Sequence, residues 1–318
     1  MCTSIAARLD NFYFGRTLDL DRDFGESVIM TPRNLPLRFR DGRITRRHYA
    51  FCGIGQAVDG YPLYADAMNE RGLCIAALNF PGNAYYPTHV QEGKRCLAPF
   101  ELIPAVMAEC ATLEDVRRML ADTAMCDVPF SDEIPNTPLH WHIADRSGSI
   151  VFEVTRVGGK VYENPHGVLA NNPPFPFHND NMALYLNISR DMPRCEVFGN
   201  GVLGHGMPGD YTSPSRFVRA SLLSRMAEGN GGAEDFFAIL GAVSVPRGSV
   251  LNAEGALHFT RYCCCMDTAE SSYFFRTCRD SRIRYVSMKK GSLDSETLLI
   301  FDIDDRDDMR RLDQPKIL

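Results

Sequence analysis

MCTSIAARLDNFYFGRTLDLD, residues 1–21, contains two strand-like segments around a turn signal. Segments 2–9 and 11–18 are rich in β-branched, aromatic and small apolar residues, and Asp10-Asn11 between them is typical of a tight turn. We therefore expect an antiparallel hairpin at the start of the chain. Its first strand carries Cys2, and its second carries the segment FGRTLD, residues 14–19.

Outward from this hairpin, blocks of strand-like sequence alternate with blocks of helical sequence. Strands are expected at 26–32, 49–58, 72–80, 139–156, 160–173, 259–268, 271–280, 283–288 and 297–303, and the segment 139–156 forms a hairpin about 146–148. Grouped strands and grouped helices are typical of antiparallel sheets with helices layered outside, not of regular βαβ winding. We expect one α+β domain over residues 1–318.

Helix boundaries are indicated by capping residues. Residues 99–123 contain apolar residues at helical spacing and are expected to form two helices, the second with Thr112 as N-cap and Asp115 three residues later. Ser213-Pro214 supplies an N-cap and a first-turn proline for a helix over 215–228, and another helix is expected at 233–243. Residues 173–209, rich in Gly and Pro, are expected to be irregular.

The composition excludes several classes of protein. The 318 residues are 45% hydrophobic and 23% charged, which is ordinary for a soluble globular chain. A formal charge of −6 argues against a nucleic-acid partner, and the basic fragments 46–49 and 288–291 are short. Charged residues from Asp10 onward interrupt any secretory h-region, and no apolar run suits a membrane span. The eleven scattered cysteines are typical of a reducing cytoplasm, where we expect the protein.

Cys2 can supply both a nucleophile and a base. Once the initiator Met1 is removed, which is usual before a small residue, Cys2 carries a thiol and a free α-amine. An α-amine has an ordinary pKa of about 7.7–8.0, far below that of a lysine, so a useful fraction is a neutral base at pH 7. This combination is the N-terminal-nucleophile solution to acyl transfer.

FGRTLD adds two charges that complement this chemistry. Arg16, on the neighbouring strand, would favour the thiolate form of Cys2. Asp19, three residues later, would accept from the α-ammonium group and hold it in place. Taken singly, each of these residues is an ordinary surface charge.

Motifs spread along the whole chain resemble the choloylglycine hydrolase family of N-terminal-nucleophile amidases. They are Met1-Cys2-Thr3 with FGRTLD, GYPLYADAMNERGLCIAALNFPG at 60–82, IPNTPLHW at 134–141, GVLANNPPFPFH at 167–178, GMPGDYTSPSRFVRA at 206–220 and VPRG at 245–248. The bile salt hydrolase branch is the most similar. The resemblance implies an αββα sandwich of two antiparallel sheets and hydrolysis, without cofactor or metal, of the amide between a bile acid and glycine or taurine.

The family's catalytic positions map onto six residues here. Cys2 matches the nucleophile, and Arg16 with Asp19 matches the pair around it. The remaining matches are Asn79 and Asn171 with the oxyanion-hole residues, and Arg216 with a further active-site arginine. Asn79 favours the bile salt branch, because the penicillin V acylase branch has tyrosine there.

The resemblance also implies an apolar slot for the steroid. By motif position, its walls are expected to include Leu18, Val58, Phe130, Ile134 and Leu139. Burial of a rigid steroid against such residues is favourable by roughly 25 cal/mol per Å². The alternative explanation for each residue is ordinary core packing.

The same motifs are also compatible with two other functions, and the resemblance implies an oligomeric state. Penicillin V acylase would use the same machinery on a phenoxyacetyl amide, and a catalytically dead protein would only bind bile acids. The family implies a homotetramer, but the segment 173–213 is shorter here than in the bile salt hydrolases. That segment borders the pocket mouth and contributes to tetramer contacts in the family.

Four weaker signals have ordinary explanations. Residues 199–204 match GxGxxG without a preceding strand or a following helix. His140 and His142 share a strand face but lack an apparent third metal ligand. Cys263, Cys264 and Cys265 alternate across a strand and are expected to be small buried residues. Ser213 and Ser215 lack a nucleophile elbow and suit helix capping.

Overall fold

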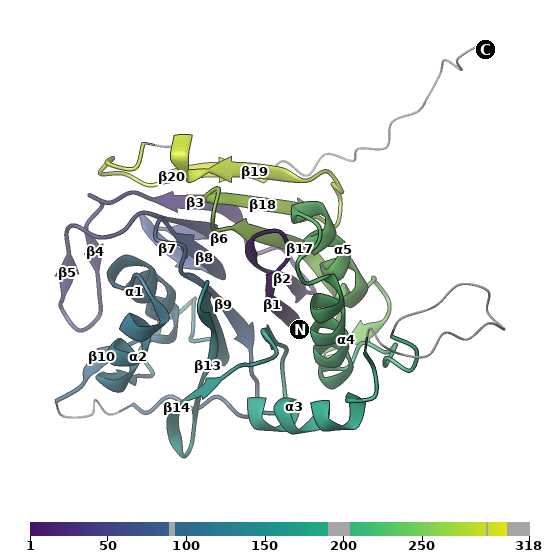
Figure 1. Cartoon of the computed structure of the whole chain (residues 1–318). Coiled ribbons are helices and arrows are strands. Elements are labelled where there is room, and N and C mark those ends of the chain that lie inside the picture. Colours follow the sequence, from purple (N-terminus) through teal and green to yellow (C-terminus); the bar gives the residue numbers. More distant parts are fainter. Residues whose placement is uncertain (89–92, 190–203, 253, 291, 304–318) are drawn as a thin grey trace, which may run out of the picture.

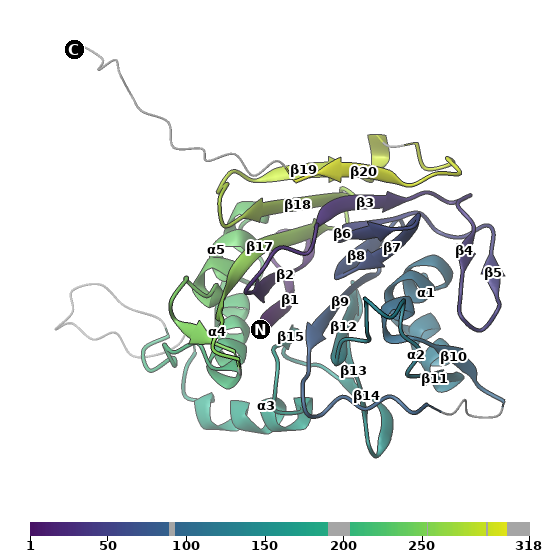
Figure 2. The same cartoon turned by 180° about the vertical axis from the view of Figure 1, so that it is seen from behind.

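Two β-sheets pack face to face, and helices cover both outer faces (Figure 1). The computed structural model describes residues 1–88, 93–189, 204–252, 254–290 and 292–303. Viewed from behind, the same four layers are visible, with α4 and α5 on one side and α1 and α2 on the other (Figure 2). The expected α+β class and αββα layering are confirmed.

The first sheet carries the N-terminal hairpin at its centre. Its strand order is β15-β1-β2-β17-β18-β19, with β16 paired to β17, and all these pairs are antiparallel. The register places Cys2 opposite Leu18 and Ser4 opposite Arg16. The strands are β1 (Cys2–Arg8), β2 (Phe12–Leu20), β15 (Val168–Leu169), β16 (Val250–Leu251), β17 (Leu257–Asp267), β18 (Ser272–Thr277) and β19 (Arg284–Ser287).

The second sheet has the order β14-β13-β12-β9-β8-β6-β3-β20, with β7 paired to β6. Its central strand β9 packs against β1 and β2 of the N-terminal hairpin, and Leu139 at the start of β12 pairs with Asn79 at the end of β9. The strands are β3 (Ser27–Thr31), β6 (Phe51–Val58), β7 (Tyr61–Tyr64), β8 (Asp66–Asn69), β9 (Cys74–Asn79), β12 (Leu139–Asp145), β13 (Gly148–Thr155), β14 (Gly158–Glu163) and β20 (Leu299–Asp302).

The outer helices bury their apolar faces against the sheets. Helices α4 (Ser213–Ala227) and α5 (Ala233–Val243) cover the first sheet, and α1 (Leu102–Glu109) and α2 (Leu113–Ala121) cover the second. Thr112 caps α2 and Asp115 completes the capping box, as predicted. The predicted N-cap of α4, Ser213, is one residue late, because Thr212 is the N-cap and its hydroxyl accepts from the Ser215 N–H. The helix itself begins two residues before the predicted range.

The segment expected to be irregular contains ordered helix. Helix α3 (Phe175–Asn181) and the 3₁₀ turn η2 (Met182–Tyr185) lie within residues 173–209. The prediction of irregular structure is wrong there because proline is tolerated in a first helical turn, where no N–H is required, and Glu153 accepts the Phe175 N–H instead of a local cap. Residues 190–203 of this segment lie outside the described chain.

Short elements connect the layers. They are β4 (Leu37–Arg38) paired with β5 (Ile44–Thr45), β10 (Arg95–Leu97) paired in parallel with β11 (Thr123–Met125), and the turns η1 (Pro99–Glu101) and η4 (Met288–Lys290). A disulfide joins Cys96 of β10 to Cys126 just after β11, with Cα atoms 5.9 Å apart. The cysteine spacing did not indicate this pairing.

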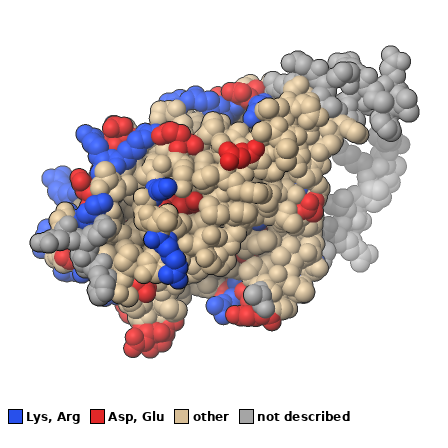
Figure 3. Space-filling model, turned by 90° about the horizontal axis from the view of Figure 1, so that it is seen from below, with Lys and Arg blue, Asp and Glu red and all other residues tan. Residues whose placement is uncertain are grey.

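The face seen in Figure 3 carries basic and acidic side chains interspersed with one another, and a broad uncharged area lies beside them. Such mixed charge gives no continuous basic field among the described residues of that face. Among the described residues, no helix is both long and apolar enough to cross a bilayer.

Candidate active site

Cys2 lies at the N-terminal end of β1 and lines a cavity whose walls include residues of both sheets. Successive side chains alternate across a strand, so Cys2 and Ser4 share the face toward the second sheet, where Ser4 contacts His142 of β12. Thr3 takes the opposite face, where Arg216 of α4 donates to its hydroxyl. Cys2 is buried, yet it contributes to the cavity wall.

Arg16 shares the cavity wall with Cys2 and is fixed by main-chain oxygens of the second sheet. Its Nη1 donates to Ala77 O at 2.6 Å and to Ala65 O at 3.1 Å. Burial alone would lower the pKa of this guanidinium, but the neighbouring Cys2, Tyr262 and Asp66 raise it. Arg16 therefore places a permanent positive charge beside the Cys2 thiol.

Asp19 lies on the other face of β2, because it is three positions after Arg16 and side chains alternate along a strand. Its Oδ1 accepts from Thr260 Oγ1 at 2.6 Å. Its Oδ2 is buried and has no hydrogen-bond partner among the described residues. Burying a carboxylate oxygen without a hydrogen bond costs free energy. Asp19 Oδ2 is therefore suited to accept from the α-ammonium group that Cys2 gains when Met1 is removed.

Asn171 and Arg216 meet at the main chain of Cys2. The Cys2 N–H donates to Asn171 Oδ1 at 2.7 Å, and Arg216 donates from Nη2 to the same oxygen at 2.9 Å and from Nη1 to Cys2 O at 2.6 Å. Burial lowers the pKa of Arg216. Asn171 is itself anchored, since its N–H donates to Ser213 Oγ at 2.8 Å.

Asn79 joins the same cluster from the end of β9. Asn171 Nδ2 donates to Asn79 O at 2.8 Å, and Asn79 lines the cavity with Cys2 and Arg16. The fold thus brings Cys2, Arg16, Asn79, Asn171 and Arg216 together from β1, β2, β9, the segment after β15 and α4, and Asp19 interacts electrostatically with Arg216 from the other face of β2.

The cavity that begins at Cys2 has a volume of about 550 Å³ and a largely apolar lining. Four of the five expected slot residues line it: Leu18, Phe130, Ile134 and Leu139. Val58 is not among the lining residues, because it lies at the far end of β6, paired with Tyr61. The sequence reasoning missed Leu20, Leu63, Pro99, Phe100 and Ile103, which also line it. Leu63 belongs to the motif at 60–82, and the other four belong to no motif that could have identified them.

A buried acid lies behind Arg16 and was also missed. Asp66 of β8 accepts hydrogen bonds from Tyr262 Oη at 2.6 Å, from Tyr273 Oη and from Cys264 Sγ at 3.6 Å. Burial raises the pKa of Asp66, and the positive charge of Arg16 partly opposes that rise. Tyr262, Cys264 and Tyr273 lie on the first sheet and Asp66 lies on the second, so the pattern of a single strand could not indicate this cluster.

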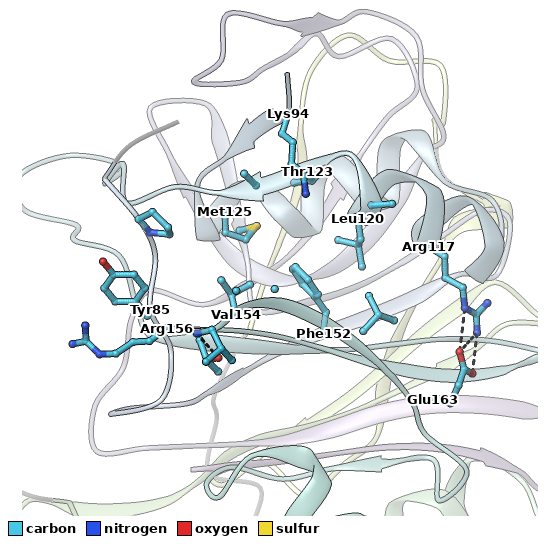
Figure 4. Close-up of a pocket in the computed structure, with 18 residues that line it drawn as sticks. Tyr85, Lys94, Arg117, Leu120, Thr123, Met125, Phe152, Val154, Arg156 and Glu163 are labelled. Atoms are coloured by element: carbon cyan, nitrogen blue, oxygen red, sulfur yellow. Dashed lines mark hydrogen bonds and ion pairs between the residues drawn. The ribbon is translucent and has the colours of Figure 1, made fainter. Parts of the chain in front are cut away.

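A larger cavity of about 840 Å³ lies elsewhere, between β14 and the α2–β11 segment (Figure 4). Phe152, Val154 and Leu120 point into it, and Arg117 and Glu163 form an ion pair of 2.8 Å at its edge. Its lining contains no Cys, Ser or His and none of the six predicted catalytic residues. Size alone therefore does not identify the reactive site.

Cys263, Cys264 and Cys265 are buried on β17, as expected. No group of three or more His, Cys, Asp or Glu side chains suited to a metal ion occurs among the described residues. Within residues 199–204, positions 199–203 lie outside the described chain.

Comparison with known proteins places these features in a family. Residues 2–301 match the model of linear amide C–N hydrolases, choloylglycine hydrolase family. A bile salt hydrolase/transferase of Lactiplantibacillus plantarum is 38% identical over 314 residues, which are 95% of this chain and 96% of the relative.

Solved structures agree with this comparison. The C2A mutant of the conjugated bile acid hydrolase from Clostridium perfringens superposes with a TM-score of 0.88 at 32% identity, covering 95% of this chain and 97% of that one. A penicillin V acylase from Agrobacterium tumefaciens has a TM-score of 0.76 at 20% identity over 93% of this chain and 90% of its own, which shows a shared fold. From the family match and the whole-length relatives together, this chain belongs to the choloylglycine hydrolase family of linear amide C–N hydrolases.

Proposed function

We propose that this enzyme hydrolyses the amide bond between a bile acid and glycine or taurine. The observation that carries the proposal is that Cys2 lines a largely apolar cavity of about 550 Å³. Cavities of this size accommodate ligands such as a steroid. The relatives that match over the whole chain are named for bile salt or conjugated bile acid hydrolysis, which supports the same substrate class.

In the proposed mechanism, Cys2 acts after Met1 has been removed. Its α-amine takes the thiol proton, the sulfur attacks the amide carbonyl, and the protonated amine then supplies a proton to the leaving nitrogen of glycine or taurine. Water hydrolyses the resulting thioester. We assign the developing oxyanion to Asn171 Nδ2 and a group contributed by Asn79. The hydrogen bond of 2.8 Å from Asn171 Nδ2 to Asn79 O keeps these two residues next to each other.

The charged residues have separate roles in this proposal. Arg16 favours the thiolate from the cavity side, where it lines the wall with Cys2. Asp19 orients the α-ammonium group through its free Oδ2 on the opposite strand face. Arg216 fixes the Cys2 carbonyl and Asn171 together through its two terminal nitrogens. No cofactor takes part in any of these steps.

The steroid occupies the apolar part of the cavity. We assign its walls to Leu18, Phe130, Ile134 and Leu139, together with Phe100, and we do not include Val58. Phe130 and Phe100 pack edge to face with their centroids 5.4 Å apart, so they form a preformed aromatic wall.

The test is a hydrolysis assay of purified, Met-processed protein with glycocholate, taurocholate and penicillin V. Released amino acid is measured with ninhydrin and the free acid by mass spectrometry. Bile salt cleavage by the wild type, lost in a folded Cys2→Ala protein, is the expected result. Faster cleavage of penicillin V, or bile salt binding without cleavage, would replace the proposal with acylase activity or with a binding function.

The remaining proposals concern assembly and location. We propose one catalytic domain over residues 1–318, working in the cytoplasm as a homotetramer, as in the family that the sequence resembles. Light scattering of the purified protein tests the tetramer, and a monomeric mass would contradict it. Cell fractionation tests the location.

A further inference from the structure

Two buried imidazoles form hydrogen bonds with the main-chain carbonyl oxygens of Ala170 and Asn171. His140 Nε2 lies 2.9 Å from Ala170 O, and His178 Nε2 lies 2.8 Å from Asn171 O. A carbonyl oxygen can only accept, so each Nε2 carries the proton and donates. Two successive carbonyls at the oxyanion segment are therefore held by histidine side chains from β12 and α3.

Glu153 of β13 connects the two histidines. Its Oε1 lies 3.0 Å from His140 Nδ1 and also accepts the Phe175 N–H at 3.0 Å. Phe175 begins α3, the helix that carries His178. His140 and Glu153 are both buried, so this carboxyl group ties the β12 histidine and the start of α3 together away from solvent.

His140 also reaches the segment of the other proposed oxyanion residue. Its ring stacks on Phe80, with centroids 4.3 Å apart and planes within 5°, and Phe80 directly follows Asn79. Asn171 Nδ2 in turn donates to Asn79 O, so the two segments that His140 contacts also contact each other. One imidazole thus touches the neighbours of both Asn79 and Asn171.

We propose that His140 and Glu153 are positioning residues that fix Asn79 and Asn171 relative to each other and to Cys2, so that the oxyanion site is formed before substrate binds. The proposal rests on the function assigned above. It also accounts for the histidine of the TPLHW motif: both of its ring nitrogens already have protein partners, so neither is available to a metal. Burial lowers the pKa of His178 to about 4, which keeps that ring neutral with its single proton on Nε2.

The first test replaces His140 by Phe, which keeps the stack on Phe80 and removes both polar contacts. Because a misplacement of about 1 Å in an active site can cost about 10²-fold, we expect kcat to fall about 10- to 100-fold. KM should stay within about threefold, since no wall residue of the cavity changes.

The matched control is His142→Phe, on the same strand and equally buried. His142 contacts Ser4 Oγ and Asn164 Nδ2, not the segment 170–171. Its kcat should stay within about threefold of the wild type. An equal loss in both variants would mean general core damage and would overturn the proposal.

A second pair of variants keeps the proposal testable if His140→Phe folds poorly. Glu153→Gln retains an acceptor for the Phe175 N–H and a hydrogen bond to His140, so kcat should stay within about fivefold of the wild type. Glu153→Leu retains neither and should lose about tenfold or more in kcat. Equal kcat values for the Gln and Leu variants would overturn the proposal.

Crystal structures separate this inference from the proposed function. If wild-type protein cleaves no bile salt conjugate, the proposed function fails whatever the variants do. In the His140→Phe structure, we expect the contact between Asn171 Nδ2 and Asn79 O to be broken or lengthened beyond 3.5 Å. An unchanged contact would overturn the positioning role, whichever amide the enzyme cleaves.

Discussion

The main-chain nitrogen of Cys2 lies 2.7 Å from Oδ1 of Asn171, a residue 169 positions away in the sequence. While Met1 is attached, this nitrogen belongs to an amide, which donates but has no basic lone pair. After Met1 is removed, the same atom becomes the α-amine, already beside the oxyanion segment. Asn171 therefore links the position of the proposed base to the position of the proposed oxyanion site.

The first prediction concerns Met1. Protein that retains Met1, or carries a residue before Cys2 that cannot be removed, should have less than about 10⁻³ of the activity of processed protein, because the base is missing. Intact mass spectrometry of each preparation, paired with its rate on glycocholate, checks this. Comparable rates in the two preparations would contradict the α-amine as base.

The second prediction concerns Asn171. Asn171→Ala removes the acceptor of the Cys2 nitrogen and the Nδ2 donor, so kcat should fall about 10²- to 10³-fold, as when one oxyanion donor is lost. Asn83→Ala is the matched control, because Asn83 donates to Asn172 and does not contact Cys2. Steady-state kinetics on glycocholate compares the two, and similar rates would remove Asn171 from the oxyanion site.

The sequence predicted the layers of the fold, and most of the candidate catalytic residues whose side chains meet at Cys2, better than it predicted the cavity wall. Strand alternation and capping are local signals, so the N-terminal hairpin and the Thr112 cap could be predicted directly. Cys2 and FGRTLD are close in sequence, and their chemistry could be weighed before any fold was known. Asn79, Asn171 and Arg216 depended on the family resemblance.

The cavity wall and the buried residues behind it depend on how strands pair and how the two sheets pack, which the sequence does not reveal. Val58 was expected in the slot because of its place in a motif, but it pairs with Tyr61 of β7 at the end of β6 and does not line the cavity. Asp66 meets Tyr262 and Tyr273 only because two sheets pack face to face. The proline-rich sequence of α3 did not indicate a helix, because the acceptor of its first N–H is Glu153 on the distant strand β13.

The third prediction concerns the aromatic wall. Phe130→Ala should raise KM for glycocholate about tenfold with little change in kcat, because partial loss of an aromatic contact costs about 1.4 kcal/mol of binding. Phe301→Ala, on β20 and outside the cavity lining, is the control and should leave KM unchanged. An unchanged KM in Phe130→Ala would place the steroid elsewhere.

The fourth prediction concerns stability in acid. Burial lowers the pKa of His142 to about 3 and that of His178 to about 4. Both rings are neutral in the folded protein at pH 5 to 6, but an unfolded histidine, with a pKa of about 6.5, takes up a proton as the pH falls through that value. The unfolded chain then binds more protons than the folded one, so the free energy of unfolding must decrease as the pH falls below about 6.5.

Well below pH 6.5 and above pH 4, each of these two histidines contributes up to about 1.4 kcal/mol per pH unit to that decrease. Urea unfolding at half-unit intervals from pH 7.5 to 4.5 measures the slope for the wild type and for His142→Gln. The variant should lose up to about 1.4 kcal/mol per pH unit of slope near pH 5, whatever its stability at pH 7.5. Identical slopes for the wild type and His142→Gln would show that His142 is protonated in the folded protein. They would contradict the assignment of a buried, neutral His142 ring between Ser4 and Asn164.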